Sequence, residues 1–433
     1  MAERFFLKTL GCKINQYESQ ALREAWTVNG LVECADPARA HVVVVNTCAV
    51  TARAVQDVRS AVRRLHRLAP RADIVVTGCA AQVHGPELIA LPGVTRLVPQ
   101  AEKEGLLASP LSHPRPLPVR DTSWPGFAIS GYNRSRAVLK IQDGCSHRCT
   151  YCIVPHARGP ARSRPPEDSL AEALRLARGG VMELIVSGTN LSQYGRDLAP
   201  GEDLWDFLTR LQKGLQDLPS PPRLRLSSLE PSQLGHKALA TLARCSLVVP
   251  HLHLSLQSAS PEVLRRMGRG HYSPDQVTGF VRDLHRVWPL FALGADFLLG
   301  FPGESEQDFC LTRDFAGDLP FSYGHVFSFS PRPGTPAASM PGRVPAPEVK
   351  QRSRSLRGEL RGKKTAFLQR LCREPRLEVV LQGGSPAKGV SRHYAECLFD
   401  HPLPGIAPGA LVAARPLGVV DGRIRVCLPE DGQ

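Results

Sequence analysis

The stretch AVLKIQDGCSHRCTYCIVPHARG, residues 137–159, places three cysteines directly after a run that is typical of a β-strand. Their spacing is C-x3-C-x2-C, at Cys145, Cys149 and Cys152. A closed zinc site takes four ligands and disulfides use cysteines in pairs, so three clustered thiols indicate a metal centre with one open position. Zinc remains an alternative, because His147 or His156 would complete a set of four ligands.

The bulk composition predicts a multidomain protein with a polyanionic partner. The chain has 433 residues, too many for one ordinary core, and carries 54 Lys and Arg against 40 Asp and Glu. This excess favours nucleic acid, although a solvated basic surface would have the same composition. We find no secretory signal and no long apolar run, and therefore expect a cytoplasmic protein with no membrane span. In that reducing compartment, clustered cysteines are metal ligands or redox groups rather than disulfides.

The first hundred residues repeat one structural unit. Short apolar runs typical of strands alternate with helical patterns, in the order 4–10, 16–28, 41–47, 51–68 and 72–78. This β-α-β-α-β alternation predicts a parallel sheet with helices on its faces.

Each of the three strand-like runs ends beside a cysteine, namely Cys12, Cys48 and Cys79. Ligands of open α/β sheets bind at the carboxyl edge, and neighbouring strands lie about 4.8 Å apart. The three thiols converge if these strands are neighbours, which predicts a second metal site. The alternative is three ordinary buried cysteines, a common fate for this residue type.

The pattern along the chain predicts an α/β fold with four parts. They are an N-terminal parallel-sheet domain (1–102), a proline-rich linker (103–134), a long series of βα units (135–372) and a small all-β domain (373–433). The βα series has strand-like runs at 183–188, 223–228, 251–256, 293–300 and 325–330, and fits a partial or full barrel with its chemistry at the carboxyl ends of the strands. A strongly basic helical segment begins at residue 347.

The C-x3-C-x2-C loop after a first barrel strand resembles the radical S-adenosylmethionine (SAM) enzymes. Tyr151 matches the aromatic position of their motif, and GADFLLGFPGES (294–305) resembles their segment near the SAM adenine. The resemblance implies that Cys145, Cys149 and Cys152 are catalytic and hold a 4Fe–4S cluster whose free iron binds SAM. It assigns SAM contacts to Tyr151, Gly188, Gly303 and Glu304.

The whole chain resembles the methylthiotransferases, a branch of the radical SAM superfamily. Residues 4 to about 340 carry this resemblance, and the tail resembles the family's RNA-binding TRAM barrel only loosely. In that family, cysteines like Cys12, Cys48 and Cys79 hold a second 4Fe–4S cluster, which holds or delivers the sulfur. One SAM donates a methyl group and another is cleaved to a radical.

The substrate expected from the resemblance is a modified adenosine of tRNA. The stretches KTLGCKINQYES (8–19), LKIQDGC (139–145) and HLHLSLQSAS (251–260) resemble the MtaB branch, which modifies C2 of N6-threonylcarbamoyladenosine at position 37, beside the anticodon. The alternatives are N6-isopentenyladenosine of tRNA or a ribosomal-protein aspartate with the same chemistry. A non-catalytic iron–sulfur RNA-binding protein and a zinc-stabilised RNA-binding scaffold are alternatives of another class.

The expected partners are a tRNA anticodon stem-loop, an electron donor of the flavodoxin or ferredoxin type, and a sulfur source. Five arginines flank the radical motif and, with the basic helix, are candidates for contacts to tRNA phosphates: Arg134, Arg136, Arg158, Arg162 and Arg164. The alternative for each of them is an ordinary solvated surface.

Overall fold

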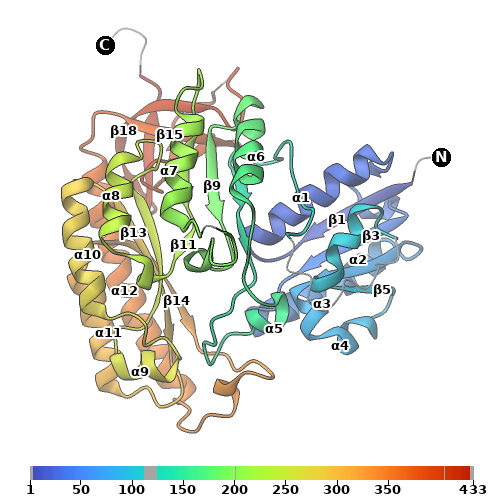
Figure 1. The fold of residues 1–433 in the computed structure, drawn as a ribbon, viewed down its shortest axis with the longest axis horizontal. Helices are drawn as coiled ribbons and strands as arrows, with labels where there is room; N and C mark the ends of the chain where they lie inside the picture. The colour runs from blue at the N-terminus through green and yellow to red at the C-terminus, as the bar shows by residue number, and fades with distance from the viewer. Residues whose placement is uncertain (1–2, 112–123, 200, 404, 430–433) are drawn as a thin grey trace.

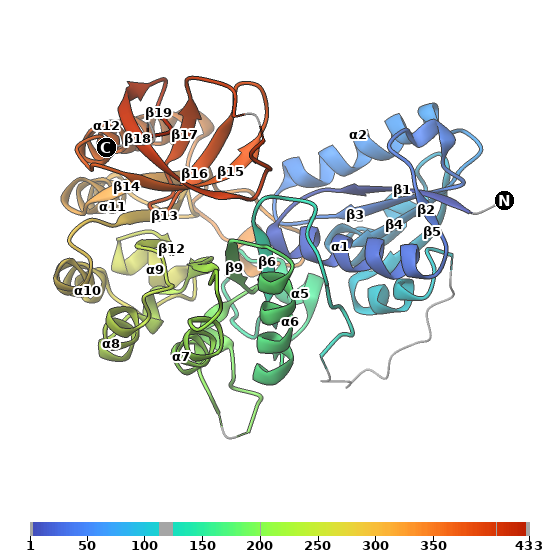
Figure 2. The ribbon, with the colours of Figure 1, turned by 90° about the horizontal axis from the view of Figure 1, so that it is seen from above.

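The computed structural model describes residues 3–111, 124–199, 201–403 and 405–429. An N-terminal α/β domain lies on one side of a central α/β domain (Figures 1 and 2). A small β-barrel packs against a different face of the central domain (Figure 2). The fold class expected from the sequence is confirmed. Part of the expected linker, residues 112–123, lies outside the described residues.

The N-terminal domain is a parallel sheet with the strand order β2-β1-β3-β4-β5. Its strands are β1 (Arg4–Thr9), β2 (Val32–Glu33), β3 (Val42–Thr47), β4 (Asp73–Gly78) and β5 (Val94–Pro99). Every residue of β3 is buried, because its alternate valines face two different cores. One core contains helix α1 (Lys13–Val28) and merges with the central domain, and the other contains helix α2 (Ala52–Leu68).

The central domain is an open, partial barrel of two parallel sheets with the orders β10-β9-β6 and β11-β12-β13-β14. Its strands are β6 (Ala137–Lys140), β9 (Glu183–Ser187), β10 (Arg223–Leu226), β11 (Ser228–Leu229), β12 (His251–Gln257), β13 (Ala292–Leu299) and β14 (Phe321–Ser328). An isolated parallel bridge pairs Leu224 of β10 with Val248, just before β12, and so brings the two sheets together. The edge strands pack against helices, β6 against α1 and β14 against α12 (Ala346–Leu371).

The outer layer of the central domain consists of helices that alternate with these strands (Figure 1). The main ones are α6 (Pro166–Arg178), α7 (Leu204–Leu215), α8 (His236–Arg244), α10 (Pro274–Val287) and α11 (Glu306–Asp318). In the described part of the chain, no helix is long and apolar enough to cross a membrane.

The C-terminal unit is a closed barrel with the order β15-β16-β17-β19-β18. Its strands are β15 (Leu377–Gly383), β16 (Lys388–Ser391), β17 (Glu396–Phe399), β18 (Leu411–Val420) and β19 (Arg423–Cys427). The last turn of α12 contributes Phe367, Leu368 and Leu371 to the core of this barrel. One helix therefore packs against both the central domain and the barrel, and fixes their relative position.

A buried carboxylate joins the barrel to the central domain. Glu183 of β9 accepts hydrogen bonds from Arg223 Nε (2.5 Å) and Arg225 Nε (2.8 Å), and Arg136 Nη1 lies at 3.3 Å. The same two arginines donate onward to barrel carbonyls, Arg223 to Val390 O at 2.8 Å and Arg225 to Ser391 O at 3.0 Å. Burial acts to raise the pKa of Glu183, but the three guanidinium groups outweigh it and hold that pKa at about 2.

A second buried carboxylate joins the N-terminal and central domains. Glu18 of α1 is fully buried and contacts Lys103 Nζ at 2.6 Å, Lys140 Nζ at 2.8 Å and Arg158 Nη1 at 3.0 Å. Lys140 and Arg158 also pair with Asp143, at 2.7 and 2.8 Å. Burial opposes the charge of Glu18, but the three cations hold its pKa well below the usual range. Two carboxylates and three cations thus pair inside the domain interface, with one positive charge in excess.

Two arginines expected to contact phosphates are part of this interface instead. Arg158 is 7% exposed and neutralises Glu18 and Asp143. Arg164 is 4% exposed and pairs with Glu172 at 2.8 Å. That part of the sequence-based hypothesis is wrong, because both guanidinium groups are satisfied by buried carboxylates and are closed to a nucleic acid.

We predict that the Glu183 cluster weakens in acid. The carboxyl titrates near pH 4.5 when unfolded and near pH 2 when folded, so its contribution is complete above about pH 5. The contribution, about 3 kcal/mol for a shift of this size, is lost as the pH falls through this window. Urea unfolding measures the free energy of unfolding of wild type and Glu183→Gln across pH 6 to 2.5. The difference between the two proteins should become smaller as the pH falls. A difference independent of pH would contradict the assignment.

We predict that Glu18→Gln strongly destabilises the chain. The substitution leaves three buried cations facing Asp143 alone, and a broken buried ion pair costs about 3–5 kcal/mol. The matched control is Glu33→Gln, which removes an exposed carboxylate that pairs with Arg23 and should cost less than about 1 kcal/mol. Urea denaturation monitored by circular dichroism measures both. Equal losses in the two variants would show that the interface does not depend on Glu18.

Candidate active site

The motif Cys145–Cys149–Cys152 lies on a loop that is fixed at both ends. Strand β7 (Gln142–Asp143) precedes the loop, and Asp143 Oδ1 accepts hydrogen bonds from Gly144 N at 2.8 Å and Thr189 Oγ1 at 3.0 Å. Cys145 N donates to Gly159 O, just after helix α5 (Val154–Arg158). All three cysteines are half-buried.

A cavity of about 530 Å³ opens directly above this loop, at the carboxyl ends of the central strands. This size is within the range of small-molecule and cofactor sites. The central domain contributes the three cysteines together with Tyr151, Asn190, Glu230, Arg269, Asp296 and Arg332. The N-terminal domain contributes residues 50–53, which begin two residues after Cys48. Both domains therefore line one cavity.

The second set of cysteines lies at the carboxyl edge of the N-terminal sheet. Cys12 is the N-cap of α1, Cys48 follows β3, and Cys79 begins helix α3 (Cys79–Val83) after β4. Strands β1, β3 and β4 are neighbours, which is the condition for convergence of the three thiols. Burial, followed by the charges of Cys12 and Cys79, raises the pKa of the Cys48 thiol to about 11.

Close backbone packing holds these cysteine loops together. Gly11 has φ +104°, and a Cβ there would lie 2.4 Å from Cys48 Cβ. Gly78 has φ +100°, and a Cβ there would lie 2.6 Å from Thr47 O. Glycine is therefore required before Cys12 and Cys79, both for the left-handed backbone and for the space.

Asn15 connects the two cysteine sets. Its Nδ2 donates to Leu10 O (2.9 Å) and Thr47 O (2.8 Å), which fixes the loops that carry Cys12 and Cys48. Its Oδ1 accepts from Arg158 Nη2 at 2.7 Å. Because Arg158 also bonds to Asp143 beside Cys145, one buried network positions both sets relative to each other.

The donor chemistry of the radical motif fits a cluster with one open position. Asn190 Nδ2 lies 3.5 Å from Cys145 Sγ, and Arg269 Nη1 lies 3.8 Å from Cys149 Sγ. Burial, and then the charges of the other two thiols, raise the pKa of Cys152 to about 12. The Cys152 thiol therefore holds its proton until a metal displaces it. His147 lines the cavity beside them, whereas His156 is exposed on α5.

The structure separates the four residues that the resemblance assigned to SAM. Tyr151 lines the cavity, and Gly188 directly precedes Thr189 and Asn190, which also line it. Glu304 instead accepts from Gly300 N and from Arg352 Nη1 at 2.7 Å, and Gly303 N donates to Gly342 O. The SAM contacts of all four stay predictions, and the last two residues stabilise the turn after β13.

Several cavity residues were not singled out by sequence reasoning. Asp296 Oδ1 on β13 accepts hydrogen bonds from His253 Nε2 on β12 (3.0 Å) and His325 Nδ1 on β14 (3.1 Å). The three strands are adjacent in the sheet. Arg269 donates to Glu230 at 2.7 Å, and Glu230 also binds His271. Glu230 directly follows strand β11, which is a weak signal because many ordinary polar residues occur at strand ends. The two histidines and Asp296 lie within strands, and Arg269 lies in a loop, so no local pattern distinguishes them.

Comparison with known proteins identifies both parts of the site. Residues 4–99 match the model of uncharacterized protein family UPF0004, and residues 139–316 match that of the radical SAM superfamily. Among solved structures, the radical SAM methyltransferase TsrM from Kitasatospora setae has a similar fold, with a TM-score of 0.57, 16% identity, and coverage of 78% of this chain and 77% of that one.

Curated relatives match along nearly the whole chain. The threonylcarbamoyladenosine tRNA methylthiotransferase MtaB of Thermotoga maritima is 32% identical over 94% of this chain and 93% of its own length. The MtaB of Bacillus subtilis is 35% identical over 78% of this chain and 75% of its own length. The tRNA-2-methylthio-N(6)-dimethylallyladenosine synthase of Polynucleobacter asymbioticus is 30% identical over 90% and 89%. This chain belongs to the radical SAM tRNA methylthiotransferase family, whose members carry two 4Fe–4S clusters and use SAM.

Proposed function

We propose that the chain adds a methylthio group to C2 of N6-threonylcarbamoyladenosine at position 37 of tRNA. The observation that supports this substrate is the similarity to five MtaB relatives, which are 30–35% identical over 78–97% of the chain. Relatives named for dimethylallyladenosine have similar identity and make that nucleoside the competing substrate. A cytoplasmic location, where tRNA is modified, completes the proposal.

We assign Cys145, Cys149 and Cys152 to the cluster that binds SAM, and the second set to the auxiliary cluster: Cys12, Cys48 and Cys79. When bound, the clusters supply the electron that cleaves SAM and the sulfur that is transferred. A flavodoxin- or ferredoxin-type protein would provide the electron, and a separate sulfur source would renew the sulfur. The cavity is lined by the first set and by residues 50–53, which lie close in sequence to Cys48. This shared lining supports the division, because the radical and the sulfur must reach the same carbon atom.

The chain itself orients the reactants and excludes water. Arg269, held by Glu230, places a positive charge beside Cys149 and stabilises negative charge at that thiolate. Leu298 and Phe329 form an apolar wall of the cavity and shield a radical from solvent. An adenine in an anticodon loop is largely unpaired, so turning it into this cavity costs less than extrusion from a duplex.

The substrate is tested with synthetic anticodon stem-loops that differ only at position 37. Reconstituted protein, SAM and a reductant are incubated with RNA carrying threonylcarbamoyladenosine, isopentenyladenosine or adenosine, and nucleosides are quantified by mass spectrometry. We expect the first RNA to react at least about tenfold faster, because a site that bonds polar groups rejects apolar analogues. Preferential reaction of the isopentenyl RNA would overturn the substrate and leave the family unchanged.

The division of labour between the cysteine sets is tested with single substitutions. Cys149→Ala should abolish formation of 5′-deoxyadenosine. Cys48→Ala should retain SAM cleavage and lose methylthiolation, with about four fewer iron atoms per chain. The matched control is Cys310→Ala on α11, a half-buried cysteine outside the cavity, which should keep both activities. Normal methylthiolation by Cys48→Ala would contradict the auxiliary assignment.

A further inference from the structure

An aromatic strip runs along the edge strand β14. Tyr323, His325 and Phe327 alternate along the strand and therefore face the same side. Their ring centroids are 5.6 Å apart for the first pair and 6.3 Å apart for the second. The His325 side chain is 55% exposed and Phe327 is 45% exposed. Neighbouring exposed aromatic rings on one strand face are not required by core packing.

One end of this strip reaches the candidate active site. Phe327 lines the 530 Å³ cavity, as does Asp296. His325 Nδ1 lies 3.1 Å from Asp296 Oδ1, so the middle ring of the strip contacts the wall of the cavity. The strip therefore leads directly out of the place where the target base reacts.

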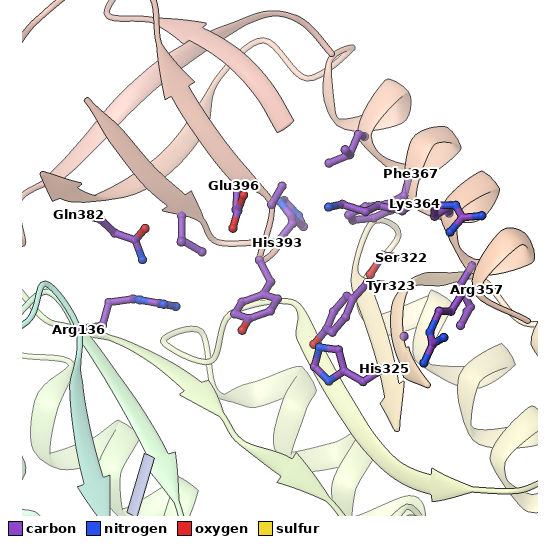
Figure 3. A pocket seen from close by; sticks show the side chains of 17 residues that line it. Arg136, Ser322, Tyr323, His325, Arg357, Lys364, Phe367, Gln382, His393 and Glu396 are labelled. Carbon is purple, nitrogen blue, oxygen red and sulfur yellow. The ribbon is translucent and has the colours of Figure 1, made fainter. Parts of the chain in front are cut away.

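The other end reaches a pocket of about 480 Å³ between β14, α12 and the C-terminal barrel. Figure 3 shows Tyr323 and His325 on β14, with Arg357 and Lys364 on the helix and His393 and Glu396 on the barrel. Arg136 lies on the opposite side of the same pocket (Figure 3). Strand β14, helix α12 and the C-terminal barrel thus all contribute side chains to this pocket.

The charges around this pocket are unbalanced. Arg361 and Lys364 line it, and neither side chain has a carboxylate partner among the described residues. The lining carboxylate, Glu396, is already paired with Arg423 at 2.9 Å. Arg357 is held by a carbonyl, Val326 O, which leaves its charge uncompensated. Cations without counter-ions beside exposed aromatic rings are the chemistry of single-stranded nucleic-acid sites.

We propose that the β14 strip and this pocket form a track for an unpaired nucleotide of the same RNA loop, next to the target base. Bases stack on the two exposed rings of the strip, His325 and Phe327, and phosphates lie against Arg361 and Lys364. The Tyr323 ring packs against neighbouring rings of the protein and supports the strip from below. The inference rests on the proposed action on tRNA and adds to it a second contact that positions the loop. The C-terminal barrel then acts together with β14 and α12, rather than as a separate RNA anchor.

The charged end of the track is tested with Arg361→Gln/Lys364→Gln. Fluorescence anisotropy measures binding of a labelled threonylcarbamoyladenosine stem-loop to reconstituted protein at several salt concentrations. We expect binding about tenfold weaker, and a log–log salt dependence shallower by about 1.4 for two lost phosphate contacts. The matched control, Lys213→Gln/Arg244→Gln, removes two exposed cations on α7 and α8, on the side away from the barrel (Figure 2), and should bind like wild type. Iron content and melting temperature establish that both proteins are folded.

The stacking end is tested by pairing protein and RNA changes. Stem-loops with one abasic nucleotide at each unpaired position are bound to wild type, His325→Ala and His325→Phe. At one position other than the target, removing the base should weaken stem-loop binding to wild type about tenfold. The same change should hardly affect binding to His325→Ala. His325→Phe should behave as wild type, because it keeps the ring and loses only the hydrogen bond to Asp296.

The outcomes separate the track from the proposed function. Equal abasic costs in all three proteins, or an unchanged affinity of the Arg361/Lys364 double variant, would overturn the track while the reaction on tRNA stands. Competition by adenosine monophosphate but not by the stem-loop would also overturn it, in favour of a small-anion site. A wild-type protein that does not prefer the stem-loop to an unrelated single strand would instead overturn the action on tRNA itself.

Discussion

The buried charge cluster around Glu18 is the interaction on which the arrangement of the two domains depends. Lys103, Lys140 and Arg158 surround this carboxylate where water cannot replace a missing partner. All members must be present together, so the two domains meet in one defined orientation. Asn15 transmits that orientation to the cysteine loops through bonds to Leu10 O, Thr47 O and Arg158. The shared cavity follows from this geometry.

The C-terminal half is organised by the same physical device. Glu183 holds two arginines whose remaining donors bind barrel carbonyls, and α12 contributes to the barrel core. Buried charges are costly, but when all are paired they allow only one register between the surfaces that they join. Here they align the aromatic strip of β14 with a positively charged pocket. A chain of contacts therefore extends from the cysteine loops to the barrel.

Sequence patterns predicted what depends on neighbours along the chain and missed what depends on distant partners. The apolar run at 41–47 was correctly predicted as a strand, and Cys12, Cys48 and Cys79 were correctly placed at strand ends. Arg158 and Arg164 were read as phosphate contacts because their partners Glu18 and Glu172 were not apparent from local sequence. Burial of a charge cannot be read from its own segment, since the group that neutralises it can lie on another domain.

We propose that this chain methylthiolates threonylcarbamoyladenosine in tRNA. The most direct measurement is mass spectrometry of tRNA nucleosides from source cells that have or lack the gene for this chain and contain no second enzyme of the same specificity. We expect 2-methylthio-N6-threonylcarbamoyladenosine to disappear, with its unthiolated precursor rising by the same amount. Unchanged levels of this nucleoside, or selective loss of the isopentenyl derivative, would contradict the claim.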